Sequence, residues 1–314
     1  MIHVYHEAAD YLVDLIASAA PQRRVIGLTT QVALAQALPD IEVLFAPTPP
    51  REGWASAHRL RLVQLLGVGA DTLLPSPDLP ARVEVAGVRG VFAADVAEHA
   101  LALMLAHARG LAQLADAQRR RQWESSPRPT LAGQQLTIVG YGAVGQHLAR
   151  VARALGMRVR AVSRTGIGLD PGLEPVELLP IPELDAAIGD AAYIVIAVPL
   201  TPATRGLFDR ARLARLRSDA FLIDVARGGI VDETALADAL GDGRLGGAAL
   251  DVFATEPLPA ESPLWTTPQL VITPHLAGLG ERYVERCVEA LLANVGALET
   301  DTPRRGLVNR DVGY

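Results

Sequence analysis

The chain has 314 residues, half of them hydrophobic and a fifth charged, and its formal net charge is −6. This length favours two domains, and the acidic balance argues against nucleic acid as a partner. No uncharged apolar run reaches the roughly 18 residues of a membrane span. All 29 basic residues are arginines, which excludes every mechanism that needs a lysine. The single cysteine, Cys287, allows no internal disulfide, so we expect a cytoplasmic protein.

The first part of the chain, over about residues 1–92, alternates short apolar runs with helical patterns. Such an alternation predicts a parallel sheet with helices between its strands. The predicted strands cover residues 2–5, 23–30, 41–47 and 59–67, and the predicted helices cover residues 8–20 and 30–38.

Residues 93–122 are rich in alanine and leucine and contain a single glycine, Gly110, so they predict one long helix or two abutting helices. A second alternating region follows, and a last helix over residues 281–299 is expected to pack back on the first domain. Six strands with helices between most of them predict a doubly wound nucleotide-binding domain. The strands cover residues 135–140, 158–163, 192–198, 220–226, 247–253 and 270–274, with helices at 142–156 and 231–243 among those between them.

The segment "VGYGAVG" places Gly140, Gly142 and Gly145 in the spacing of a dinucleotide-binding turn, between a predicted strand and a predicted helix. The first glycine permits a tight turn, the second lets a pyrophosphate approach the backbone, and the third lets helix and strand pack closely. A turn without a ligand is the alternative. The strands that follow favour the binding turn.

The stretch "RVRAVSRTG" lies where an NAD-binding domain usually carries a carboxylate for the ribose hydroxyl, and it has none. Ser163, Arg164 and Thr165 instead offer two hydroxyls and a guanidinium, which can bind the 2′-phosphate of NADP. This pattern predicts NADP(H) as the preferred cofactor and leaves NAD(H) open. In the alternative interpretation, Arg164 is a solvated arginine or stacks on adenine without selecting the cofactor.

Polar residues follow three of the predicted strands. Arg227 comes after the fourth strand of the second region. Asp251 lies near the end of the fifth strand and Glu256 follows it, and His275 comes after the sixth strand. Ligands of open α/β sheets bind beyond the carboxyl ends of the strands, so we expect these side chains to line one crevice.

These motifs resemble the D-isomer-specific 2-hydroxyacid dehydrogenases, a family that includes glyoxylate/hydroxypyruvate reductases and phosphoglycerate dehydrogenases. The likeness rests on "AEHALALMLAHAR", "VGYGAVG", "DVARGGIVDETAL", "DVFATEPLP" and "SPLWTTPQLVITPHLAG" between about Ala97 and Gly278. It is weaker in the first ninety residues, where "LLGVGADTL" is the main match. The resemblance implies a Rossmann cofactor domain, residues 97–280, inserted in a flavodoxin-like substrate domain, residues 1–96 and 281–314. It also implies a homodimer, with residues 93–122 as the expected contact.

The resemblance also assigns roles. The catalytic trio is Arg227, Glu256 and His275: the arginine holds and polarises a 2-keto acid, the histidine donates the proton, and the glutamate orients the imidazole. The substrate is expected to contact Val68 and Gly69 of a glycine loop, together with Arg227 and His275. The cofactor-binding positions are Gly140, Gly142, Ala143, Val144, Gly145, Ser163, Arg164, Thr165, Val198, Pro199, Val225, Ala226, Asp251, His275 and Gly278.

The predicted function is therefore NAD(P)H-dependent reduction of a small 2-keto acid, such as glyoxylate or hydroxypyruvate, to the D-2-hydroxy acid. A dinucleotide-binding sensor or corepressor without turnover is the alternative from another class. Related phosphite and formate dehydrogenases are disfavoured, since the first use a lysine and the second a glutamine–histidine pair. Singly, Arg227, Glu256 and His275 also fit an ion-pair arginine, a loop acid and a strand-end histidine. The other six histidines have no assigned role, and no metal site is expected.

Overall fold

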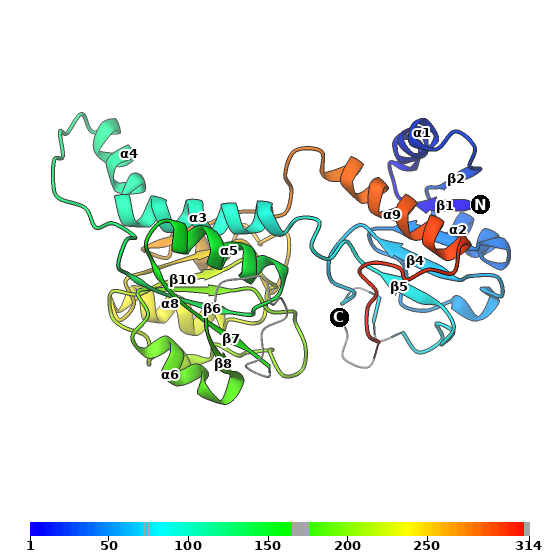
Figure 1. Ribbon diagram of the computed structural model, residues 1–314. Helices are drawn as coiled ribbons and strands as arrows, with labels where there is room; N and C mark the ends of the chain where they lie inside the picture. Colours follow the sequence, from blue (N-terminus) through cyan, green and yellow to red (C-terminus); the bar gives the residue numbers. More distant parts are fainter. Residues whose placement is uncertain (72, 75, 165–175, 311–314) are drawn as a thin grey trace. The chain divides into compact units, whose positions relative to one another are not determined.

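The computed structural model describes residues 1–71, 73–74, 76–164 and 176–310, and the chain divides into two units (Figure 1). Unit 1 comprises Met1–Phe92 and Glu281–Tyr314, and unit 2 comprises Ala93–Gly280. Unit 1 is therefore discontinuous in sequence, and the chain passes between the units twice.

Unit 1 is built on a parallel sheet of five strands in the order β2-β1-β3-β4-β5, which is the flavodoxin-like order. Its strands are β1 (Ile2–Tyr5), β2 (Val25–Leu28), β3 (Val43–Ala46), β4 (Leu62–Leu65) and β5 (Glu84–Ala86). Its helices are α1 (Ala9–Ala19), α2 (Gln31–Ala37) and α9 (Tyr283–Glu299). Helix α9 packs on this sheet through Cys287, Val288 and Leu291, which are buried with residues of β1 and β3.

Unit 2 is built on a parallel sheet of seven strands in the order β12-β11-β10-β9-β6-β7-β8. The order reverses at β6 and β9, which confirms the doubly wound class and gives the sheet a topological switch point. The strands are β6 (Gln135–Val139), β7 (Arg158–Ser163), β8 (Glu177–Pro180), β9 (Tyr193–Ile196), β10 (Phe221–Asp224), β11 (Gly247–Leu250) and β12 (Leu270–Ile272).

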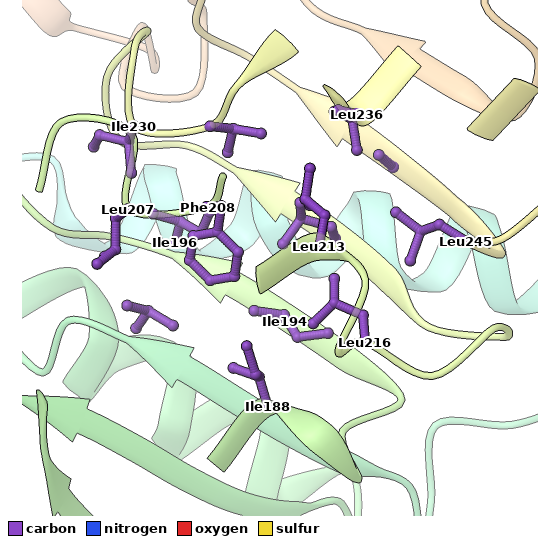
Figure 2. Close-up of a cluster of buried hydrophobic side chains, with 14 of the residues drawn as sticks. Ile188, Ile194, Ile196, Leu207, Phe208, Leu213, Leu216, Ile230, Leu236 and Leu245 are labelled. Carbon is purple, nitrogen blue, oxygen red and sulfur yellow. The ribbon is translucent and has the colours of Figure 1, made fainter. Parts of the chain in front are cut away.

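The central strands of unit 2, β6, β9, β10 and β11, are buried along their whole length because both faces of the sheet are covered there. In β9, Tyr193 and Val195 are buried with α3 (Ala93–Arg109) and α5 (Ala143–Ala154). Ile194 and Ile196 point to the other face, where they meet the core shown in Figure 2. The helices of that second face are α6 (Leu184–Gly189), α7 (Arg210–Leu213) and α8 (Glu233–Gly241).

The helical region before β6 forms two abutting helices, α3 and α4 (Leu111–Arg119). Gly110 between them has φ 64°, a left-handed conformation that suits glycine and ends α3. Figure 1 shows α4 and the loop after it reaching away from the sheet of unit 2. This arm carries exposed apolar side chains, among them Leu111 and Trp123, the latter 96 % exposed.

Candidate active site

The glycine turn after β6 has a separate physical reason for each of its three glycines. Gly140 has φ 109°, and a Cβ there would lie 2.3 Å from the Ala197 carbonyl oxygen. A Cβ on Gly145 would lie 2.1 Å from the Gly140 carbonyl oxygen, so this residue permits the helix to pack against the turn. A Cβ on Gly142 would meet nothing within 4 Å. The turn is thus tight on its inner side and open at Gly142.

Helix α5 begins at this open position. Its N-cap is Gly142, which has no side chain to cap the helix, and Gly142 and Ala143 are exposed while Val144 is half-buried. The first N–H groups of a helix have no partner within the helix, and together with the helix dipole they favour an anion. The chain therefore fits a dinucleotide pyrophosphate at this turn.

The residues at the end of β7 are the predicted contacts of the cofactor ribose. Ser163 is the last residue of the strand and is half-buried, and Arg164 directly after it is exposed. Thr165, the third residue predicted here, lies outside the described residues.

The segments after β9 and β10 supply the next predicted cofactor positions. Val198 and Pro199 are half-buried after β9, and Val225 and Ala226 are buried after β10. Asp224, at the end of β10, accepts a hydrogen bond from the Ala226 N–H at 2.9 Å. Burial raises the pKa of the Asp224 carboxyl to about 8, well above its ordinary value.

Glu256 and His275 form a hydrogen-bonded pair. The imidazole Nδ1 lies 2.7 Å from Glu256 Oε2, and the other carboxylate oxygen, Oε1, accepts from the Phe253 N–H at 2.9 Å. The glutamate is thus held by the backbone on one side and holds the imidazole on the other. Because Nδ1 faces the carboxylate, Nε2 is the nitrogen left for another partner, and the side chain of His275 is 44 % exposed.

Arg227 lies in the loop after β10, and this loop is in close contact with the segment that carries Glu256. A Cβ on the next residue, Gly228, would lie 1.9 Å from both the carbonyl carbon and the oxygen of Phe253. The half-buried Arg227 side chain donates from Nη1 to the Ala226 carbonyl oxygen at 2.7 Å. The contact at Gly228 therefore joins the loop of the arginine to the loop of the glutamate.

Asp251 is 1 % exposed at the end of β11 and organises the loop around His275. Its carboxylate accepts from Thr273 Oγ1 at 2.6 Å and from the N–H groups of Leu276 at 3.0 Å and Ala277 at 2.9 Å. Its carbonyl oxygen accepts from the His275 N–H at 2.7 Å. Gly278, the last predicted cofactor position, follows this loop directly and is half-buried.

The structure adds two residues, His99 and Thr273, whose part in this site the sequence pattern does not predict. His99 lies on α3, and its Nε2 is 3.1 Å from Thr273 Oγ1 and 3.7 Å from Asp251 Oδ1. Thr273 could have been found from the sequence, because it lies at the end of a predicted strand, two residues before His275. His99 gives no comparable signal, since its partner lies 174 residues away.

The predicted substrate residues Val68 and Gly69 belong to unit 1, in the loop after β4. The Leu66 carbonyl oxygen accepts from the Tyr283 hydroxyl at 2.8 Å and from Cys287 Sγ at 3.4 Å. The Gly67 carbonyl oxygen accepts from the Val88 N–H at 3.1 Å. The start of the loop is thus fixed by its carbonyls, and Val68 is 44 % exposed.

Neither a three-ligand metal site nor a membrane-spanning helix occurs within residues 1–71, 73–74, 76–164 and 176–310. No group of three or more histidine, cysteine, aspartate or glutamate side chains in these ranges is placed to hold a metal ion. No helix in the same ranges is long and apolar enough to cross a membrane.

Comparison with known families and proteins gives consistent matches. The family model described as "D-isomer specific 2-hydroxyacid dehydrogenase, NAD binding domain" matches residues 101–277. Glyoxylate/hydroxypyruvate reductase A of Serratia proteamaculans is 33 % identical over 277 residues, covering 85 % of this chain and 85 % of that protein. D-3-phosphoglycerate dehydrogenase of Mycobacterium leprae is 34 % identical over 295 residues, covering 85 % of this chain, but the match spans only 53 % of that protein.

Among solved structures, a D-isomer specific 2-hydroxyacid dehydrogenase of Xanthobacter autotrophicus Py2, in complex with NADPH and MES, has a TM-score of 0.89. It is 31 % identical, and the match covers 100 % of this chain and 99 % of that chain.

Proposed function

The chain belongs to the D-isomer specific 2-hydroxyacid dehydrogenase family, and from this premise we propose that it reduces a small 2-keto acid to the D-2-hydroxy acid with NADPH. In this reaction, keto acid, NADPH and a proton give hydroxy acid and NADP⁺. The observation that carries the proposal is the Glu256–His275 pair at 2.7 Å. It sits at the edge of the sheet that also carries the glycine turn and Arg227.

His275 is the proton donor in this proposal. A neutral or charged imidazole whose Nδ1–H is held by Glu256 presents Nε2 to the substrate, and in the charged form Nε2 carries a proton for the keto oxygen. Since Glu256 is itself fixed by the Phe253 N–H, the ring has a defined orientation before substrate binds.

Arg227 is the residue that binds and polarises the substrate. A guanidinium stays charged throughout the reaction and can hold a carboxylate through two parallel hydrogen bonds. NADP(H), when bound, supplies the hydride for the carbonyl carbon. Its pyrophosphate is assigned to the open turn at Gly142 and the start of α5, and its nicotinamide end to Val198, Pro199, Ala226 and Asp251.

The loop of Val68 and Gly69 is assigned to the substrate carboxylate. The carbonyl oxygens of Leu66 and Gly67 already accept hydrogen bonds from donors of unit 1. This supports the proposal that the loop binds an anion through its backbone N–H groups. A loop of small residues lets a carboxylate come close to the backbone.

The substrate class is a small unphosphorylated 2-keto acid. The Serratia relative, covered over 85 % of its length, is named a glyoxylate/hydroxypyruvate reductase. The phosphoglycerate dehydrogenase relative is matched over about half of its length. Glyoxylate and hydroxypyruvate are therefore the first candidates, and 3-phosphohydroxypyruvate comes after them.

A panel of keto acids tests this function. We expect the purified protein to oxidise NADPH with glyoxylate or hydroxypyruvate, as measured by the loss of absorbance of the reduced nicotinamide, and to form the D isomer. Pyruvate, longer keto acids and 3-phosphohydroxypyruvate complete the panel, each with NADPH and NADH. Dinucleotide binding without turnover on any of them would instead support a sensor.

NADP(H) is the cofactor we assign, on account of Ser163 and Arg164 at the end of β7 in place of a carboxylate. The Xanthobacter structure, which is named as an NADPH complex, agrees with this assignment. A guanidinium binds the 2′-phosphate of NADPH, and NADH has no such group.

Arg164→Ala should therefore weaken NADPH binding by about tenfold or more, the effect of losing one charge-assisted hydrogen bond or two, and change NADH binding little. Dissociation constants for both nucleotides, measured by fluorescence or calorimetry, check this. Arg158→Ala, at the exposed start of the same strand, is the matched control. An equal loss of affinity for both nucleotides would contradict the assignment.

A homodimer is the expected assembly, with the helical region 93–122, which includes α4, and Trp123 directly after it as the contact. Trp123, at 96 % exposure, and Leu111, at 53 %, are large apolar side chains that a partner would cover. Light scattering should give a mass of about twice 33.3 kDa, and a monomer at all concentrations would contradict it.

The buried Cys287 suits a reducing compartment, and we expect the protein to lie in the cytoplasm, which cell fractionation can test.

A further inference from the structure

Helix α3 sends one polar side chain, His99, toward the loop that carries His275. The imidazole is largely buried, with 16 % of its side chain exposed, and its Nε2 lies 3.1 Å from Thr273 Oγ1. Thr273 belongs to the segment after β12, two residues before His275. A contact between a helix on one face of the sheet and the loop at its edge thus joins segments far apart in sequence.

The direction of this contact follows from counting protons. The Thr273 hydroxyl has a single proton, and its oxygen lies 2.6 Å from Asp251 Oδ1, which as a carboxylate can only accept. The hydroxyl therefore donates to Asp251 and accepts from His99, whose Nε2 carries the proton. The result is one directed chain, from imidazole to hydroxyl to carboxylate, in which each bond polarises the next.

The carboxylate at the end of this chain fixes the backbone on either side of the His275 imidazole. Besides Thr273, it accepts from the N–H groups of Leu276 and Ala277, and the Asp251 carbonyl accepts from the His275 N–H. His275 has φ 52°, a left-handed conformation that is uncommon for a non-glycine residue. The bonds to Asp251 hold the residue there, and with it the ring that meets Glu256.

We propose that His99 is a positioning residue: by donating to Thr273 it orients the hydroxyl that, with Asp251, holds the His275 loop in its left-handed conformation. This inference rests on the proposed function in that His275 is taken as the proton donor. In this role His99 acts through its Nε2–H group and its position on α3, and the imidazole touches neither substrate nor cofactor.

The test compares His99→Leu with His99→Gln. Leucine fills the space without a donor, whereas the glutamine amide can place an N–H near the position of Nε2. We expect His99→Leu to lower kcat by about tenfold, the kinetic equivalent of one hydrogen bond, with KM and the NADPH dissociation constant within about twofold. His99→Gln should recover most of the loss. Thr273→Val should match His99→Leu, and the double variant should be no slower than either single one, since both break the same chain.

His107→Leu is the matched control for a purely structural effect. His107 lies further along the same helix and is also partly buried, but its ring stacks on Phe221, 3.9 Å between centroids, on the face of the sheet. We expect it to lower the melting temperature without lowering kcat. An equal fall of kcat in His107→Leu, or a His99→Gln variant as slow as His99→Leu, would overturn the proposal.

Hydrogen–deuterium exchange gives a readout that needs no turnover. In His99→Leu the Leu276 and Ala277 amides should exchange faster than in the parent, and in His99→Gln and His107→Leu they should not. An inactive parent protein refutes the proposed function, while this exchange result still decides the role of His99. An active parent with unchanged kcat and unchanged exchange in His99→Leu refutes the positioning role alone.

Discussion

Replacing His275 with alanine should lower kcat for keto-acid reduction by about 10²- to 10⁴-fold, the usual contribution of a general acid. The reason is that Nε2 of His275 is the atom proposed to deliver the proton, since Nδ1 is held by Glu256, and alanine offers no proton at all. NADPH binding should change little, since the pyrophosphate is assigned to the turn at Gly142. Steady-state kinetics with glyoxylate or hydroxypyruvate and a nucleotide titration measure the two quantities.

His275→Asn is a useful second variant because asparagine tolerates the left-handed φ of 52° found at this position. It should fold like the parent and still lose turnover. His58→Ala, at an exposed position of unit 1, controls for the loss of a histidine elsewhere. Turnover retained by both His275 variants would mean that another group donates the proton.

Gly228→Ala should destabilise unit 2 strongly, lowering the free energy of unfolding by roughly 3 kcal/mol or more. The added Cβ would lie 1.9 Å from the backbone of Phe253, so one of the two loops must move. Backbone cannot rotate away as a flexible side chain can. Urea denaturation measures the change.

Gly241→Ala, in the last turn of α8, is the matched control, because a Cβ there meets nothing within 4 Å. Alanine in a helix is favoured over glycine by about 0.5–1 kcal/mol, so this variant should be as stable as the parent or more stable. Because Gly228 lies between Arg227 and the Glu256 loop, its alanine variant should also lose activity in the fraction that still folds. Parent-like stability of Gly228→Ala would mean that the two loops are not in contact.

Much of the fold could be predicted because the strands of a buried parallel sheet are largely apolar. The predicted strands match β1 to β4 of unit 1 and six of the strands in unit 2. The two strands that were missed are short edge strands. β5 has three residues, and β8, "ELLP", ends in proline and is only partly buried, so neither differs from a loop in its sequence.

The candidate site was predictable where it depends on strand ends. Arg227, Asp251 and His275 follow β10, β11 and β12, which pair in parallel, so a pattern read along the chain assigns them to one edge. The environment of Asp251 was not predictable in this way. Its three donors come from a left-handed loop and a threonine, and the partner of that threonine is on α3. Such contacts depend on how a helix packs, which one sequence does not specify.

The Leu66 carbonyl oxygen accepts hydrogen bonds from two residues of α9, and this has a consequence for the order in which the chain folds during synthesis. Strand β4 and the glycine loop leave the ribosome early, whereas Tyr283 and Cys287 come more than two hundred residues later. The whole of unit 2 is made in between, and can fold around its own two cores before unit 1 is finished. The Leu66 carbonyl therefore gains these two donors only after unit 2 has been made, so a ribosome-bound chain can hold a folded unit 2 before the start of the glycine loop is fixed.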